Sequence, residues 1–355
     1  MKFKLLQANN GDAIHLRTKD EDGNFRNILI DSGTGETYSY KNKKGKSEDG
    51  ELKQLIECIR RKNELIDLFI LTHVDYDHIG GILKWFEQDA DAKDLVKKVW
   101  FNSGRLIFEH FQQQEIEENL LRIKNTSCTN TSIAQGVAFE DFIEENDIWD
   151  RRIIKSGDVF NIFGLKFTML SPSNDKLQSL LCKWEKECPI SDTSRSSDYS
   201  LSLSDLINSD FFKEDDSIHN GSSIAFVVEK QGKSILFLGD AHPQTIINSL
   251  KNLGYSPKNP LKVDFVKISH HGSKANTNME LLELIQSDNF MISSNGSKHK
   301  LPDKRCLARI IRSKEHVNLY FNYPELASNI FTEQDTIDYP NFSIVDAQDY
   351  IELWI

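Results

Sequence analysis

The sequence predicts an α/β fold in which helices cover layered, mixed sheets. Strand-like segments, some alternating polar and apolar residues and some continuously apolar, recur along both halves of the chain. Stretches with helical spacing lie between many of them, which favours a layered α/β arrangement. The chain has 355 residues, of which 39% are hydrophobic, so it can bury a sizeable core.

The first third of the chain predicts a sheet whose strands lead into polar loops. Alternating or apolar runs predict strands at residues 2–8, 13–18, 27–31 and 65–71. Helical spacing predicts helices at residues 51–62 and 79–88, and the lysine-rich residues 38–50 are expected to form a polar loop. A strand that ends in a charged loop before a helix is a common way to build a site, because the strand fixes the loop.

The rest of the chain alternates strands and helices and carries two polar insertions. We expect the insertions at about residues 106–150, which are helical and acidic, and 173–216, which contain a Ser-rich stretch. A hairpin is expected at residues 157–171, with its turn at Phe163 and Gly164. Further strands are expected at residues 223–229, 234–238, 263–268, 290–293, 317–322 and 350–354, and helices at 243–253, 279–287 and 303–313. We expect a single domain over residues 1–355 that contains both insertions.

Composition excludes several classes of protein. The chain carries 43 Lys and Arg against 54 Asp and Glu, a net charge of −11, which argues against broad coating of nucleic acid but allows a nuclease with bound metals. No apolar run approaches the roughly 20 residues of a membrane span, and the first residues lack a signal-peptide pattern. We therefore expect a cytoplasmic protein with no membrane partner. The five cysteines are scattered without a CxxC pair and are expected to be reduced thiols.

The strongest functional signal is the segment THVDYDHIGG at residues 72–81, directly after an apolar strand. It places His73, Asp75, Asp77 and His78 within six residues. Four potential ligands this close cannot share one face of a helix or strand, so a loop that wraps around a metal ion is the natural explanation. The alternative is a solvated turn in which Asp77 or His78 lies near the N-terminus of the next helix.

This segment resembles the HxHxDH signature of the metallo-β-lactamase fold, in the HxDxDH variant of the ComEC-type hydrolase domain and its stand-alone relatives. Further blocks match in the expected order: GDAIHL at 11–16, ILIDSG at 28–33, HNGSSIAF at 219–226, ILFLGDAH at 235–242 and KISHHGS at 267–273. The resemblance covers most of the chain outside the two insertions. It implies a four-layer αββα sandwich with mixed sheets and helical insertions.

The resemblance also implies ligands for two divalent metal ions, zinc or manganese, with magnesium as a further candidate. The implied ligands are His73 and Asp75 for one ion, Asp77 and His78 for the other, Asp240 as a bridge, and a further ligand from the pair His270 and His271, of which the sequence does not say which. Asp75, Asp77 and His78 are also the residues expected to carry catalysis. Without the resemblance, Asp240 fits a helix N-cap equally well, and the histidine pair fits a polar loop.

The sequence departs from the family pattern at two positions. Asp75 replaces a second histidine, and the more oxygen-rich site should shift the preference from zinc toward manganese or magnesium. Leu301 stands where relatives usually carry a histidine before Pro-Asp, and His299 either takes its place or lies on the surface. The residues expected to support the ligands or contact the substrate are Asp31, His219, Asn220, His299 and Lys274. Of these, His219 is alternatively a ligand.

A two-metal site predicts hydrolysis, because two ions can activate a water and hold both the attacking and the leaving oxygen. The ligands alone do not fix the substrate. A basic rim would suit a phosphodiester, and its candidates are residues 41–46, Lys274, Lys298, Lys300, Lys304 and Arg305. Tyr38 and Tyr40 could stack on bases. The alternative is that these cations are ordinary surface lysines.

The resemblance to the ComEC-type hydrolase domain, which is associated with DNA degradation during uptake, favours a phosphodiesterase or nuclease. Its substrate would be a phosphodiester, with nucleic acid included. Two other classes stay open: a small-molecule esterase or phosphoesterase of the cyclic-nucleotide or phosphocholine type, and a non-catalytic metallo-fold that acts as an interaction partner. The oligomeric state is not predicted.

Overall fold

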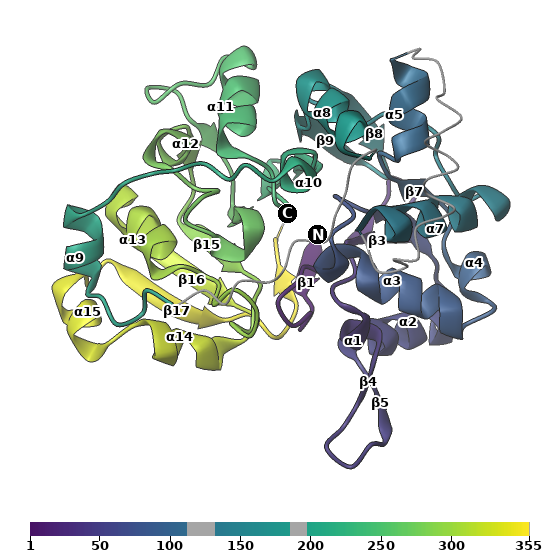
Figure 1. Ribbon diagram of the computed structural model, residues 1–355, viewed down its shortest axis with the longest axis horizontal. Helices are drawn as coiled ribbons and strands as arrows, with labels where there is room; N and C mark the ends of the chain where they lie inside the picture. The colour runs from purple at the N-terminus through teal and green to yellow at the C-terminus, as the bar shows by residue number, and fades with distance from the viewer. Residues whose placement is uncertain (112–131, 185–196, 355) are drawn as a thin grey trace.

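Two β-sheets pack face to face, and helices cover the outer face of each (Figure 1). The computed structural model describes residues 1–111, 132–184 and 197–354. Within these residues the chain forms the four αββα layers that the sequence predicted, so the predicted fold class is confirmed.

The first sheet holds the N-terminal strands. Its order is β18 (Ile351–Glu352), β1 (Lys2–Leu5), β2 (Ile14–Lys19), β3 (Phe25–Ile30), β6 (Ile66–Ile70) and β7 (Val99–Trp100). Strands β1 to β3 pair antiparallel, whereas β3, β6 and β7 are parallel. β3 and β6 therefore end at the same edge of the sheet.

The second sheet is larger and also mixed. Its order is β17 (Phe342–Asp346), β16 (Val317–Phe321), β15 (Asn289–Ile292), β13 (Phe265–Lys267), β11 (Lys233–Phe237), β10 (Ala225–Lys230), β9 (Leu165–Ser171) and β8 (Val159–Ile162). The strands from β11 to β17 are parallel, and β8 to β11 are antiparallel. The ends of β11 and β13 thus lie side by side.

Strand β6 shows how the sequence pattern makes the layers. All five of its residues are buried, as expected for a strand covered on both faces. Leu68 and Ile70 belong to the apolar core between the sheets, whereas Phe69 and Leu71 belong to the core under the helices. The side chains therefore alternate between two cores, and this packing fixes the carboxyl end of β6.

One helical layer covers each sheet. Helices over the first sheet are α1 (Gly35–Tyr38), α2 (Glu51–Arg61), α3 (Tyr76–Gln88), α4 (Ala92–Leu95) and α7 (Ser132–Glu145). Those over the second are α9 (Leu203–Asn208), α11 (Pro243–Asn252), α12 (Met279–Glu283), α13 (Lys304–Ser313), α14 (Pro324–Ile330) and α15 (Glu333–Asp338). Short elements complete the fold: β4 (Ser39–Lys41), β5 (Ser47–Asp49), β12 (Leu261–Lys262), β14 (Ile285–Gln286), α10 (Ile218–Gly221) and η1 (Ser269–Gly272).

The two predicted insertions meet each other in the structure. Helix α5 (Gly104–His110) from the first packs on α8 (Asn174–Trp184) from the second, through an apolar cluster of Ile107, Leu177, Leu180 and Leu181. Part of the expected Ser-rich stretch lies outside the described residues. Cys58 and Cys306 are free thiols, while Cys128 and Cys188 also lie outside the described residues.

Several element predictions were wrong. Residues 38–50 are not a loop: Tyr38 ends α1, and β4 and β5 form a short hairpin that projects from the body (Figure 1). The helix predicted at 279–287 ends at Glu283, because the chain turns there into β14, which pairs with β12. Helices α14 and α15 and strand β17 were not predicted. None of the helices in the described ranges is long and apolar enough to cross a membrane.

Candidate metal centre

Polar side chains from four strand ends converge at one edge of the sandwich. Asp31 follows β3, and Thr72 and His73 follow β6. Asp240 follows β11 across a Gly239 turn, and the His270–His271 pair follows β13. Parallel strands place their carboxyl ends at a common edge, so residues far apart in sequence meet here.

The HxDxDH segment is part loop and part helix. Helix α3 starts at Tyr76, so Asp77 and His78 lie in its first turn, and Asp75 occupies the N-cap without a side-chain cap hydrogen bond. The Asp75 carboxylate is therefore not used for capping. Asp240 is not a helix N-cap either, because α11 begins after His242.

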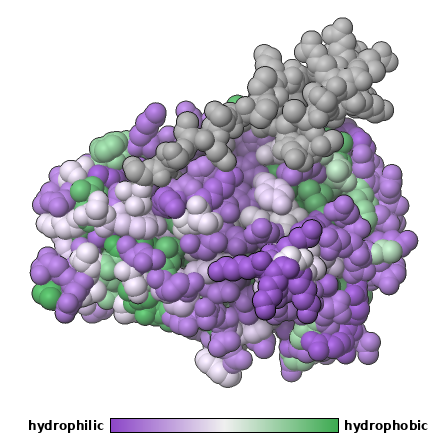
Figure 2. All heavy atoms as spheres, turned by 60° about the horizontal axis from the view of Figure 1, so that its bottom comes forward, coloured by the Kyte–Doolittle hydropathy of each residue, from purple (hydrophilic) through white to green (hydrophobic). Residues whose placement is uncertain are grey.

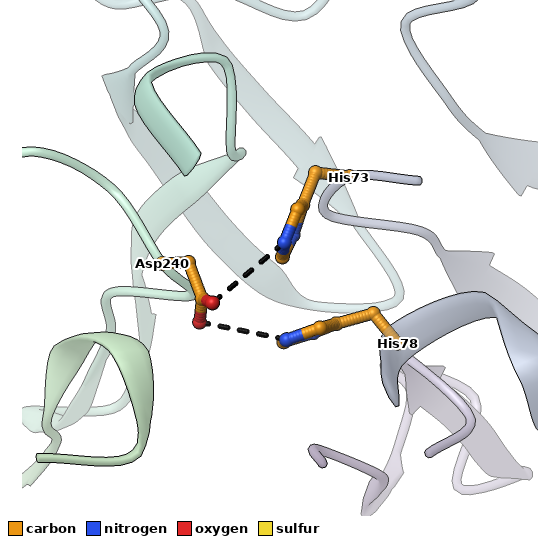
Figure 3. A group of neighbouring side chains, drawn as sticks. All are labelled: His73, His78 and Asp240. Atoms are coloured by element: carbon orange, nitrogen blue, oxygen red, sulfur yellow. Dashed lines mark ion pairs between the residues drawn. The ribbon is translucent and has the colours of Figure 1, made fainter. Parts of the chain in front are cut away.

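Asp240 lies between the two histidines of the segment, as Figure 3 shows. Its Oδ2 is 3.7 Å from Nε2 of His73, and its Oδ1 is 3.5 Å from Nε2 of His78. Asp75 lies beside His73, with 3.8 Å between Oδ2 and Nε2. His219 joins this side, because its Nδ1 is 3.5 Å from Oδ1 of Asp75. His73, Asp75, His219 and Asp240 thus form one group.

A second group forms around His78, Asp77 and His271. Nε2 of His271 is 3.6 Å from Oδ2 of Asp77 and 4.0 Å from Oδ2 of Asp240. Ligand atoms of Asp77, His78 and His271 lie within 4.8 Å of one another, as do those of His73, His78 and Asp240. These two sets of three share His78, and Asp240 of one set lies 4.0 Å from His271 of the other, which is the arrangement expected of two adjacent cation sites.

The donor atoms of this centre fit divalent metal ions. Nε2 of His73, His78 and His271 and Oδ1 of Asp240 are buried and have no hydrogen-bond partner. Buried polar atoms are normally paired, so four such atoms aimed at a common space indicate a missing partner. Imidazole nitrogens and carboxylate oxygens are ligands of zinc and manganese, and the residues present therefore fit the metal ions that the sequence implied.

Burial and neighbouring charges shift the pKa values of His73, His78 and Asp240. Burial, together with the nearby His78, lowers the pKa of His73 to about 3, so this ring is neutral and able to bind a cation. Burial also disfavours a charged His78, but Asp240 and Asp31 outweigh it and raise the pKa of His78 well above its ordinary value. The pKa of Asp240 lies well below its ordinary value because the histidines outweigh the effect of burial. Asp240 is therefore a carboxylate.

Asp31 fixes the ligand loop from behind. Its carboxylate accepts hydrogen bonds from the backbone N–H of Thr72 at 2.8 Å, from the Thr72 hydroxyl at 2.7 Å and from Nδ1 of His78 at 2.8 Å. Because a carboxylate only accepts, Nδ1 of His78 carries the hydrogen and Nε2 is left to face the cluster. This is the supporting role expected of Asp31.

Asp12 and Lys267 form a buried pair behind His271. Nζ of Lys267 lies 2.6 Å from Oδ2 of Asp12, and Oδ1 of Asp12 lies 3.3 Å from Nδ1 of His271. Nδ1 of His271 also lies 3.1 Å from the carbonyl of Ser293. Gly11 lets this loop approach, since a Cβ on it would lie 1.9 Å from the carbonyl oxygen of Asp77.

His270 faces the same centre from a more exposed position. Its Nε2 is 3.8 Å from Oδ2 of Asp240, and its side chain is 26% exposed, against 2% for His271. Of the pair, it is His271 whose buried Nε2 has no partner. His271 is therefore the better ligand, and His270 lies on the solvent side together with Asp75 and Asp77, which are 34% and 21% exposed.

The predicted basic rim is partly wrong. Nζ of Lys304 is fully buried and lies 2.6 Å from Asp335, and Arg305 donates to the carbonyls of Leu206 and Ser209. Both cations hold the fold together, and neither lines the site. Tyr38 is also buried, at 3% exposure, and cannot stack on a base.

The remaining candidates are exposed to different degrees. Lys298, His299 and Lys300 lie on an exposed loop, and His299 is absent from the ligand groups found among the described residues. Lys274 pairs with Asp303 at 3.6 Å. Leu301 is buried, so the corner where a histidine was expected is apolar.

Sequence reasoning missed Asp12, Lys267 and Asp215 as parts of this centre. Asp12 and Lys267 lie inside the blocks GDAIHL and KISHHGS, so their position beside the ends of predicted strands was a usable signal. Asp215 lies in the second insertion, and no motif marks it.

Part of the chain is similar to a known protein family. Residues 22–160 match the family model of the metallo-beta-lactamase superfamily. ComE operon protein 3 of Bacillus subtilis (strain 168) is 24% identical over 352 residues, which cover 94% of this chain and 35% of that protein. The chain thus spans about a third of the length of this relative.

Solved structures with similar folds have low sequence identity. The metallo-beta-lactamase fold protein YhfI from Bacillus subtilis is 10% identical, with a TM-score of 0.41 and 99% of both chains covered. Zn(2+)-bound PqqB from Methylobacterium extorquens is 10% identical, with a TM-score of 0.42 over 99% of this chain and 100% of that one. The isothiocyanate hydrolase from Delia radicum gut bacteria is 12% identical, with a TM-score of 0.42 and 99% of both chains covered.

Proposed function

Because the chain carries a metal-dependent hydrolase domain of the metallo-β-lactamase superfamily, we propose that it is a phosphodiesterase that acts on nucleic acid. The observation that carries the proposal is the pair of ligand groups that adjoin at His78 and Asp240. Two adjacent cations suit a displacement at phosphorus, in which both the attacking and the leaving oxygen need stabilisation.

Two sets of residues would hold the ions. His73, Asp75 and His219 would hold one, Asp77, His78 and His271 the other, and Asp240 would contribute to both. The bound ions would supply Lewis-acid activation of water and stabilisation of negative charge. Three carboxylates in this set make it oxygen-rich, and we propose manganese as the preferred ion.

The protein's own residues prepare the site. Asp31 holds the His78 ring from behind, and the Ser293 carbonyl holds the His271 ring with Asp12 beside it, so the cation-binding nitrogens do not need to reorient. Burial of His73, His78, His271 and Asp240 keeps bulk water away from the ligands. A substrate would reach the centre from the side where Asp75, Asp77 and His270 are exposed.

Surface features near this side suit an extended anionic substrate. Tyr76, between Asp75 and Asp77, is 48% exposed and is a better candidate for base stacking than the buried Tyr38. Lys298 and Lys300 are exposed on the loop that follows Asn295. The backbone N–H of Asn295 donates to the carbonyl of Asn9, and the neighbouring Asn10 donates to the Asp77 carboxylate.

A second group of cations lies on the β4–β5 hairpin. The exposed lysines of the hairpin are Lys41, Lys43, Lys44 and Lys46. Figure 2 shows the side of the molecule from which the hairpin projects, and this side is largely hydrophilic. Localised cations of this kind can attract a phosphodiester even though the net charge is −11.

A substrate panel tests the proposal. Bis-p-nitrophenyl phosphate, linear DNA and RNA, cyclic nucleotides and a phosphocholine ester would be offered with manganese, zinc or magnesium. We expect cleavage of bis-p-nitrophenyl phosphate and of a nucleic acid, fastest with manganese, and a loss of about 100-fold or more in Asp240→Asn. Asp264→Asn, at the start of β13 and away from the centre, is the matched control and should retain activity.

The same panel separates the other classes. Cleavage confined to a cyclic nucleotide or the phosphocholine ester would replace the nucleic-acid substrate with a small molecule. Absence of hydrolysis of every compound, in protein that binds the ions, would contradict an enzymatic role. The variant Asp75→His tests the metal preference, since a second histidine should move the best activity from manganese toward zinc.

A further inference from the structure

The second insertion places the carboxylate of Asp215 beside the metal centre. Residues 197–217, here called the strap, run along the helical layer of the second sheet and end at α10 (Figure 1). Near its end lies Asp215, whose side chain is 12% exposed. No sequence motif marked this residue, and the ligand set does not include it.

Asp215 binds three side chains around the exposed side of the centre. Its Oδ2 accepts from Nδ2 of Asn220 at 2.7 Å and from Nδ2 of Asn276 at 3.1 Å, and it lies 3.4 Å from Nδ1 of His270. Its Oδ1 accepts the backbone N–H of Ser217 at 2.9 Å, which fixes the carboxylate itself.

These contacts orient His270. Nδ1 of His270 lies 3.1 Å from Oδ1 of Asn276, 3.4 Å from Oδ2 of Asp215 and 3.3 Å from Nδ2 of Asn220. The first two are acceptors, and the Asn220 amide makes its shorter bond to Asp215 at 2.7 Å, so we assign the hydrogen to Nδ1 of His270 as a donor. Nε2 is then directed toward Asp240, 3.8 Å away, on the side that solvent reaches. Asn276 also donates to the carbonyl of Asp240 at 3.2 Å, which ties this network to the centre.

The strap is held rigidly enough to place Asp215. Arg309, on α13, donates to the carbonyl of Phe211 at 2.8 Å and to the Asp210 carboxylate at 3.0 Å. The backbone N–H of Asp215 donates to the carbonyl of Ala275 at 3.1 Å, close to the loop that follows the histidine pair. Because these contacts fix the backbone around Asp215, its carboxylate can hold the His270 ring at little entropic cost.

We propose that Asp215 is a positioning residue for the hydrolytic reaction, which acts by holding His270 toward the substrate side of the metal centre. The proposal rests on the proposed hydrolase function. The strap is then part of the reaction site, and its role goes beyond covering the second sheet.

A double-mutant cycle tests the coupling. With bis-p-nitrophenyl phosphate and manganese, Asp215→Ala should lower kcat about 10- to 100-fold with little change in KM, because a misplaced group acts mainly on the reacting complex. In a His270→Ala background the same change should cost less than about two-fold. Asp215→Asn, which keeps one acceptor oxygen, should recover part of the rate.

Asp205→Ala, in α9 of the same strap, is the matched control. It removes a carboxylate that accepts from the Ser202 hydroxyl at 2.7 Å and is not used to place Asp215, so kcat should be unchanged. Effects of Asp215→Ala and His270→Ala that multiply independently would overturn the proposal, as would an unchanged kcat in Asp215→Ala.

A second readout does not depend on activity. In metal-free protein with ¹⁵N-labelled histidine, Asp215→Ala should change the Nδ1 and Nε2 resonances of His270, whereas Asp205→Ala should not. Unchanged His270 resonances in Asp215→Ala would overturn the proposal even in an active enzyme. If no substrate is cleaved, the hydrolase function fails, and the resonances still decide whether Asp215 holds His270.

Discussion

Replacing Asp31 with asparagine is expected to weaken metal binding while preserving the shape of the side chain. Asp31 accepts three hydrogen bonds, two from Thr72 and one from Nδ1 of His78, all between 2.7 and 2.8 Å. An asparagine has only one acceptor oxygen. With that oxygen toward the backbone N–H of Thr72, its amide nitrogen faces Nδ1 of His78, and donor meets donor.

The variant then has two unfavourable choices. Either a buried donor pair stays unsatisfied, or the His78 ring moves its hydrogen to Nε2, the atom that faces the cluster. An unsatisfied buried group costs about 1–3 kcal/mol, which corresponds to a loss of about 10- to 100-fold in affinity. Losses of this size are typical for residues that orient metal-binding histidines.

Competition titration against a fluorescent chelator measures this affinity. Asp67→Asn is the matched control, because Asp67 is a buried carboxylate at the other end of β6 that accepts from Asn27 and Arg26. It should lower stability and leave metal affinity within about two-fold. A folded Asp31→Asn protein that binds manganese or zinc as tightly as the wild type would refute the role of Asp31.

Three further predictions address other parts of the structure. Burial raises the pKa of Glu140 from 4.5 to about 7, so its stabilising contribution is complete below pH 4.5 and is lost as pH rises through 7. In urea unfolding, wild-type stability relative to Glu140→Gln should therefore fall by about 3 kcal/mol between pH 4.5 and 8, and parallel pH dependences would contradict this. His271→Ala should reduce bound metal by about one ion per chain in elemental analysis, whereas His270→Ala should retain more, and the reverse order would reject His271 as the ligand. Lys304→Ala should destabilise the protein by about 3–5 kcal/mol in chemical denaturation, because Asp335 would stay buried without its partner, and a change below about 1 kcal/mol would count against this pair.

Local sequence pattern predicted layered, mixed sheets and singled out the segment at residues 72–81, whereas the four-layer order and the choice of Asp240 and the histidine pair came from the family resemblance. The strand ends after β6, β11 and β13 were visible as apolar runs followed by polar ligands, and parallel strands force such ends together. His73, His78 and Asp240 meet for this reason. Their neighbourhood follows from sequence because each residue comes directly after a buried strand.

Burial of charged residues could not be predicted in the same way. Lys304 and Arg305 follow a Pro-Asp pair and resemble surface cations, but their partners Asp335 and Leu206 come from distant segments. Tyr38 is buried because the chain folds into α1 and packs under the first helical layer. Such outcomes depend on tertiary contacts that no local pattern encodes.

Asp215 shows the same limit within the centre. Asp215 reaches His270 only because of the course of the strap, and the sequence of that segment has no recognisable pattern. Asp12 lies in the GDAIHL block, so its place near the centre could have been predicted. Its pairing with Lys267 could not, because the two residues are 255 positions apart.

Metal content tests the central claim most directly. The protein is dialysed against manganese, freed of excess ions and analysed by elemental mass spectrometry. It should contain about two divalent ions per chain. The same preparation of Asp240→Asn should contain fewer, because Asp240 lies between both ligand groups. Folded wild-type protein that retains no manganese, zinc or magnesium would contradict the assignment of this centre as a two-metal site.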